Sequence, residues 1–202
     1  MNILSSGKKP QCIFQYRKKS VQALVLIIGT NDHEKNKLTS KSFRTIFPDA
    51  YYVLVNKSGS RLNENVNYTG LYHTVLDVDV PSLYDAHPSC ILMREGLRYI
   101  YGTFFKEFDT DLIIKTNSGT SVPSSFTPET INSKRYNFFT MYGDVLDDME
   151  FDSVVFTIPV FELKNFIDRV SKVISTCSNT VLCAESTYRR IIPFDKIKLH
   201  SR

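Results

Sequence analysis

A short polar stretch that follows an apolar run is the part of this sequence best suited to bind a charged ligand. Residues 112–114 are apolar, too few for a helix and typical of a strand buried in a parallel sheet. The residues after them are small and polar, and Pro123 prevents a central strand from continuing. Hydroxyls and backbone N–H groups of such a loop can bind a phosphate, with a lysine adding positive charge nearby. The candidate phosphate-binding residues are therefore Lys115, Asn117, Ser118, Gly119 and Thr120. A plain turn is the alternative interpretation.

Two other polar turns are predicted to lie beside this loop. Residues 21–28 and 51–55 read as buried strands, and the segment between them reads as a helix that Asn31 or Asp32 caps and that runs through Phe43. The helix is expected to carry a thin apolar stripe formed by Leu38, Ser42 and Ile46. A strand–helix–strand unit of this size favours parallel pairing with a right-handed crossover. Both strands then end at the same edge, where ligands bind in open α/β sheets. The candidate ligand-binding residues at this edge are Thr30, Asn31, Asp32, Asn56 and Lys57.

The rest of the chain continues the alternation of strands and helices. Strands are expected within residues 71–80, 136–142 and 153–158, and amphipathic helices over residues 89–105 and 160–174. This order predicts an α/β fold with a mostly parallel central sheet flanked by helices. We expect one domain over residues 21–202, preceded by a basic N-terminal arm or edge element over residues 1–20.

Composition excludes several function classes. The 202 residues carry a formal charge of +4, which is too weak an excess to predict specific nucleic-acid binding. The longest apolar run near the start is far shorter than a membrane span, so we expect a soluble protein without a transmembrane segment, cytoplasmic rather than secreted. The four cysteines lack metal-ligand spacing: Cys12, Cys90, Cys177 and Cys183. We expect reduced, buried thiols, and a disulfide that bridges Cys177 and Cys183 around a loop is the alternative.

Three pairs of acidic residues could in principle hold a metal ion, and each has a simpler interpretation. Asp77 and Asp79 fit the solvent face of a half-buried strand. Asp109 and Asp111 precede a strand and so belong to the opposite edge of the sheet, and the pair at 147–148 fits a solvated acidic loop. We therefore predict no metal site. The sequence also lacks a Walker or dinucleotide-binding motif.

The middle of the chain resembles the β-1,3-galactosyltransferase-like nucleotide-sugar glycosyltransferases. The resemblance covers residues 80–88, the Gly96-Leu97-Arg98 centre of the expected helix, and the strand that ends in Lys115-Thr116. It implies a GT-A type, Rossmann-like fold, a nucleotide-sugar donor and a glycan acceptor. In that family an acidic triplet follows the Lys-Thr pair and holds a divalent cation, usually manganese. Here the triplet is Asn117-Ser118-Gly119, so we expect no cofactor and at most weak binding of a cation such as Mn²⁺.

The resemblance also points to a candidate general base. The family tends to carry a Glu-Asp pair whose acid faces the acceptor hydroxyl, and Glu185-Ser186 stands at that place here. A single carboxylate there can remove the proton of the attacking hydroxyl. The alternative is an ion pair with Arg189 on a helix surface. Two functions remain open: a glycosyltransferase, possibly metal-independent, or a catalytically inactive domain of the same fold that binds protein partners as part of an assembly.

Overall fold

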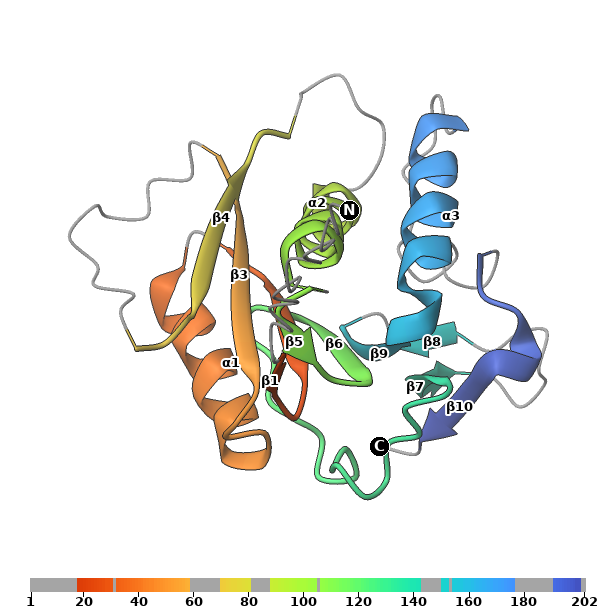
Figure 1. Ribbon diagram of the computed structural model, residues 1–202, viewed down its shortest axis with the longest axis horizontal. Helices are drawn as coiled ribbons and strands as arrows, with labels where there is room; N and C mark the ends of the chain where they lie inside the picture. The colour runs from red at the N-terminus through yellow and green to blue at the C-terminus, as the bar shows by residue number, and fades with distance from the viewer. Residues whose placement is uncertain are drawn as a thin grey trace, which may run out of the picture.

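Strands and helices alternate along the chain in the computed structural model (Figure 1), which describes residues 18–30, 32–58, 70–80, 88–104, 106–142, 150–152, 154–176 and 191–200. The helices are α1 (His33–Ile46), α2 (Pro88–Tyr99) with its π-helical extension η1 (Ile100–Phe104), α3 (Leu163–Thr176), and the 3₁₀ turns η2 (Val160–Glu162) and η3 (Phe194–Lys196). The strands are β1 (Lys19–Ser20), β2 (Leu24–Ile28), β3 (Tyr51–Lys57), β4 (Thr74–Val78), β5 (Phe108–Asp109), β6 (Leu112–Asn117), β7 (Tyr136–Tyr142), β8 (Glu150–Asp152), β9 (Val155–Pro159) and β10 (Ile197–His200).

A five-stranded sheet in the order β4-β3-β2-β6-β9 forms the centre of the described part of the molecule. Its first four strands are parallel, and β9 pairs with β6 in the antiparallel sense. Ile28 at the end of β2 lies opposite Val55 of β3 and Asn117 of β6. The carboxyl ends of these three strands therefore meet at one edge, and the expected mostly parallel α/β fold is confirmed.

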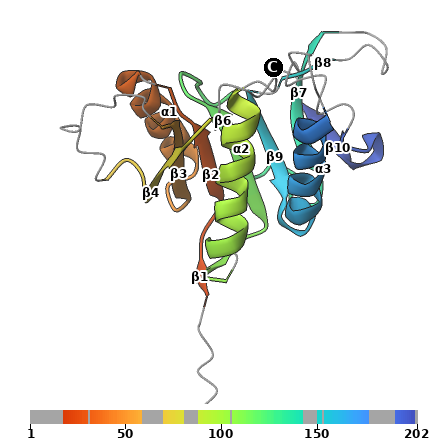
Figure 2. The same ribbon diagram turned by 90° about the horizontal axis from the view of Figure 1, so that it is seen from above.

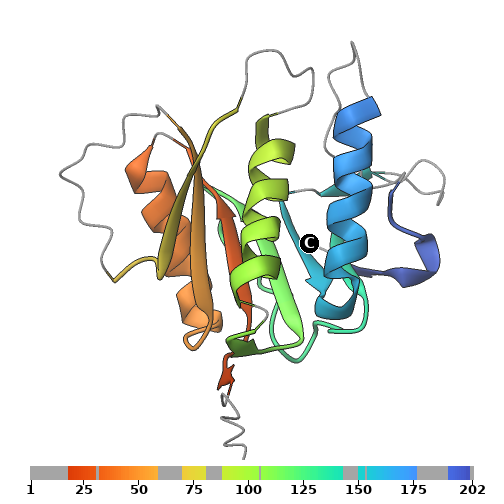
Figure 3. The ribbon, with the colours of Figure 1, turned by 45° about the horizontal axis from the view of Figure 1, so that its top comes forward.

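Helices cover both faces of the sheet. Helices α2 and α3 pack against each other on one face and α1 lies on the other (Figures 2 and 3). Alternate residues of β2 enter the two cores, with Leu26 on the α2 side and Val25 on the α1 side. A strand buried on both faces explains the uninterrupted apolar run between residues 23 and 28.

Helix α1 buries a polar face, which differs from the expected apolar stripe. The Asp32 side chain caps it as predicted, accepting a hydrogen bond from the Lys35 N–H at 3.2 Å. The predicted stripe included Leu38, but that side chain is 53% exposed. The buried residues are instead Asn36, Thr39, Ser40 and Phe43. The prediction of an apolar stripe was wrong at Leu38, because polar partners on neighbouring loops, not apolar ones, cover most of the buried face of α1.

Several short elements were not predicted. Strands β1, β5, β8 and β10 have two to four residues each, too few for a periodic pattern, and pairing with other strands defines them. The pairing of β1 with β5 makes residues 19–20 an edge element, while most of the predicted arm lies outside the described residues. Cys90 is a buried cysteine that is not part of a disulfide, and the other three cysteines lie outside the described part. No helix among the described residues is long and apolar enough to cross a membrane.

A glycine in α2 allows the helix to approach the sheet closely. A Cβ atom added at Gly96 would lie 2.6 Å from the Leu26 Cδ1 and 2.8 Å from the Val55 Cγ2. Both side chains are fully buried in the core and have no free space to move into. Gly102, in η1, has no atom within 4 Å of the same position.

We predict that Gly96→Ala destabilises the protein although alanine favours helix formation. Overpacking of this kind costs about 1–3 kcal/mol of unfolding free energy. The gain in helix propensity is about 1 kcal/mol, so over most of this range the variant is less stable. Denaturant unfolding of Gly96→Ala and the control Gly102→Ala measures the difference. A Gly96→Ala variant more stable than Gly102→Ala would show that the helix does not approach the sheet this closely.

Candidate functional site

The loops after β2 and β6 touch at the carboxyl edge of the sheet. The Ser118 N–H donates to the Ile28 carbonyl at 2.9 Å, which continues the pairing of the two strands by one residue. Just beyond, the Thr30 and Ser118 hydroxyl oxygens lie 3.3 Å apart. Thr30 and Ser118 were selected from separate turns of the sequence, and the structure brings them together at one place, which we call the corner. Both hydroxyls can contact a ligand at the corner.

The end of β3 adds a buried amide to this edge. The Gly29 N–H donates to the Val55 carbonyl at 2.8 Å, and the Asn56 side chain, 1% exposed, lies against Gly29. A Cβ atom at position 29 would lie 2.0 Å from the Asn56 Oδ1, so this position requires glycine. Neither polar atom of the Asn56 amide has a hydrogen-bond partner within the described residues, and the same is true of the Asn117 Oδ1. Buried amide atoms without partners mark a place that a ligand or water completes.

The loop after β6 is fastened to helix α1. The Gly119 N–H donates to the Lys35 carbonyl at 3.3 Å, the Thr120 N–H to the Thr39 Oγ1 at 3.0 Å, and the Val122 N–H to the Ser42 Oγ at 2.9 Å. Together with the bond from Ser118, this occupies the N–H groups of residues 118–120. The expectation that these N–H groups bind a phosphate was wrong, because Ile28 of β2 and residues of α1 already accept their hydrogen bonds. The side-chain hydroxyls of Thr30 and Ser118 remain available to bind a phosphate.

Two of the predicted cations have different surroundings. Lys115 is 2% exposed, and its Nζ lies 5.4 Å from the centroid of the Phe156 ring. Because side chains alternate along β6, this ammonium is buried on the α2 and α3 side of the sheet rather than exposed beside the loop. Lys57 is exposed at the end of β3, next to Asn56. Two more predicted site residues, Asn31 and Glu185, lie outside the described residues.

Sequence reasoning missed two residues of α1 that shape the corner. Asn36 is fully buried and binds both backbone groups of Thr30: its Oδ1 accepts from the Thr30 N–H at 3.1 Å and its Nδ2 donates to the Thr30 carbonyl at 2.9 Å. The Lys35 side chain lies over the loop, with its Cδ 3.6 Å from the Cβ position of Gly119. The sequence offered one signal for Asn36, which is a polar residue at a helix position that faces the interior of the protein.

The residues at this corner do not fit a divalent cation. Such ions prefer several anionic oxygens. Among the described residues, the corner holds one carboxylate, Asp32, which caps α1 and lies 3.7 Å from the Lys35 Nζ. Within the described ranges, no group of three or more His, Cys, Asp or Glu side chains could hold a metal ion. The chemistry of the corner is that of hydroxyls, amides and one exposed lysine.

Comparison with solved structures identifies the fold. A glycosyltransferase involved in the glycosylation of the major capsid of PBCV-1 aligns at a TM-score of 0.54 and 12% identity, over 89% of this chain and 81% of that chain. A 4-diphosphocytidyl-2C-methyl-D-erythritol synthase from Anaerococcus prevotii aligns at 0.49 and 11% identity, over 91% and 87% of the two chains. The glycosyltransferase GlyE of Streptococcus pneumoniae aligns at 0.46 and 13% identity, over 90% of this chain and 45% of its own.

These comparisons bear on the fold and not on the reaction. No protein-family model matches the chain, and no curated protein matches it in sequence. At 12% identity the likeness to the capsid glycosyltransferase establishes the GT-A type fold alone. The function has to be argued from the residues at the carboxyl edge.

We predict that Asn36→Ala destabilises the protein and loosens the corner. It leaves the Thr30 N–H and carbonyl without their partners, which costs about 1–3 kcal/mol. Lys37→Ala, at the next and more exposed position, serves as the control. Denaturant unfolding measures the change in unfolding free energy, and amide hydrogen exchange at residues 29–30 measures the local opening of the turn. Equal stability of the two variants would contradict the role assigned to Asn36.

Proposed function

We propose that this chain is a nucleotide-sugar glycosyltransferase that transfers a sugar to a carbohydrate or glycoconjugate acceptor without a metal ion. The observations that carry the proposal are the amide atoms of Asn56 and Asn117 without partners in the described residues, at the ends of the strands on either side of β2, and the paired hydroxyls of Thr30 and Ser118. They lie at the edge of a GT-A type sheet where ligands bind. The resemblance of residues 76–122 to the β-1,3-galactosyltransferase-like family supports the same donor class.

Each turn has a role in this proposal. The Asn56 amide carries a donor and an acceptor side by side, which is complementary to the hydrogen-bonding edge of a nucleotide base. The hydroxyls of Thr30 and Ser118 bind the diphosphate. The nucleotide side of the site comprises Thr30, Asn31, Asn56 and Lys57, and the phosphate side comprises Asn117 and Ser118.

The reaction is a displacement at the anomeric carbon of the donor sugar. The acceptor oxygen forms the new bond as the bond from the sugar to the nucleoside diphosphate breaks, and Glu185 takes the acceptor's proton. The diphosphate leaves with the bonding electrons, so fixed donors aimed at its oxygens lower the barrier. This assignment of Glu185 rests on the family resemblance.

Nucleotide binding is the first test. With UDP at about 100 times its dissociation constant, binding adds about 2.7 kcal/mol of stability, which raises the melting temperature by about 5–10 °C for a domain of this size. Asn56→Ala is expected to lose most of this shift, while its melting temperature without nucleotide changes little because the amide has no described partner. An unchanged UDP shift in Asn56→Ala would contradict the role of this amide.

Catalysis is tested separately. We expect Glu185→Gln to lower turnover of UDP-sugars by about 10²–10⁴-fold while nucleotide binding persists. The control is Glu129→Gln, because Glu129 is an exposed glutamate in the loop that precedes β7. Product formation is measured by release of UDP. Full activity of Glu185→Gln would exclude this residue as the base.

The second candidate is an inactive domain of the same fold that acts as a binding or structural component of an assembly. The absence of carboxylates from Asn117-Ser118-Gly119 favours it. Under this alternative the wild-type protein releases no UDP from any UDP-sugar, and Glu185→Gln behaves like the wild type. Sugar transfer by the wild-type protein would exclude it.

A further inference from the structure

A nucleoside diphosphate brings negative charge that the carboxyl edge has to neutralise. The corner does not fit a divalent cation, so the positive charge must come from the chain. We propose that Lys35, in the first turn of α1, supplies the charge that binds the diphosphate. This inference rests on the proposed function, because it concerns the same site.

Lys35 is held next to the loop that replaces the acidic triplet. Its carbonyl accepts the Gly119 N–H at 3.3 Å, and its side-chain stem packs over Gly119. Gly119 has a φ of 82°, a conformation in which other residues are strained. A Cβ atom at Gly119 would lie in ordinary contact with the lysine stem, so the backbone conformation rather than space favours glycine there. The side chain is 62% exposed, so the ammonium can turn to a ligand at the Thr30 and Ser118 hydroxyls.

Among the described residues, the other sources of positive charge near this corner are already used or lie elsewhere. The N–H groups of residues 118–120 are bonded within the protein, and the Asp32 carboxylate occupies the N-terminus of α1. The Lys115 ammonium is buried over Phe156. Lys57 extends from β3, which β2 separates from β6.

The present contact of the Lys35 ammonium is weak. Its Nζ lies 3.7 Å from the Asp32 Oδ2, and both side chains are about half exposed or more, at 62% and 48%. Ion pairs of this kind contribute little in water, so a diphosphate can replace the carboxylate. The Asp32 charge then repels the ligand. Removing that charge should strengthen binding, whereas removing a metal ligand would weaken it.

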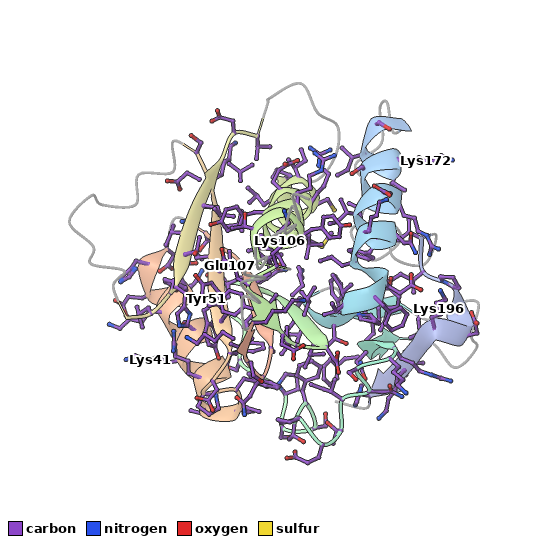
Figure 4. The ribbon with its side chains drawn as sticks, viewed as in Figure 1. Lys41, Tyr51, Lys106, Glu107, Lys172 and Lys196 are labelled. Carbon is purple, nitrogen blue, oxygen red and sulfur yellow. The ribbon has the colours of Figure 1, made fainter. Side chains whose placement is uncertain are left out.

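The experiment measures UDP binding to the full chain by calorimetry, with EDTA or with Mn²⁺. The variants are Lys35→Ala, Lys35→Arg, Asp32→Asn and the control Lys41→Ala. Lys41 is on the same helix, and its exposed side chain points away from the rest of the molecule (Figure 4). Asparagine also caps helices, so Asp32→Asn changes the charge and keeps the cap. Far-ultraviolet circular dichroism confirms that each variant is folded.

We expect the wild-type protein to bind UDP equally well with EDTA and with Mn²⁺. Lys35→Ala should weaken binding by about tenfold or more, which corresponds to one hydrogen bond to a charged group. Lys35→Arg and Lys41→Ala should stay within about threefold of the wild type, and Asp32→Asn should bind UDP more tightly.

Two sets of results would overturn the inference. If Lys35→Ala binds as tightly as the wild type, or if Asp32→Asn binds more weakly, then Lys35 does not supply the charge although the proposed function stands. If the wild type binds UDP only with Mn²⁺, the inference fails together with the metal-independent part of the proposed function, while nucleotide binding stands. If the wild-type protein binds none of UDP, CDP, GDP and ADP under either condition, the proposed function fails and the inference fails with it.

Discussion

The hydrogen bonds between the polar face of α1 and the loop after β6 hold the candidate site together. The hydroxyl oxygens of Thr39 and Ser42 accept hydrogen bonds from N–H groups of the loop, and the Asn36 side chain bonds to the turn after β2. Because one helix fastens both turns, the hydroxyls of Thr30 and Ser118 meet at a fixed corner. A helix with an apolar face could not do this, since it would leave the N–H groups of two loops without acceptors.

The same arrangement determines the electrostatics of the corner. Backbone N–H groups that bond to α1 no longer attract an anion, and the Asn-Ser-Gly triplet brings no carboxylate to attract a cation. The charge of a bound diphosphate then has to be met by side chains. A single exposed lysine is screened by water and is a weaker electrostatic partner than a fixed dication. Any catalysis here depends more on the positioned hydroxyls and amides than metal-dependent transfer does.

The fold alone leaves the activity open. A GT-A type sheet presents strand ends at one edge, and proteins of different function use that edge with different side chains. In this chain the informative features are local: glycine at position 29 because an amide lies beneath it, and two asparagines whose buried polar atoms have no partner among the described residues. Such amides cost stability unless a ligand completes them, which makes them a functional signal independent of the fold.

The sequence by itself determined the order of the main strands and helices, the parallel pairing of the first unit and the edge at which Thr30, Asn56 and Ser118 gather. Apolar runs and turn residues are local, so they can be read along the chain. Only the tertiary structure decided that β9 is antiparallel, that the Lys115 ammonium is buried and that the loop's N–H groups bond to α1. These features depend on partners distant in sequence, and no local pattern specifies which acceptor a polar group will find.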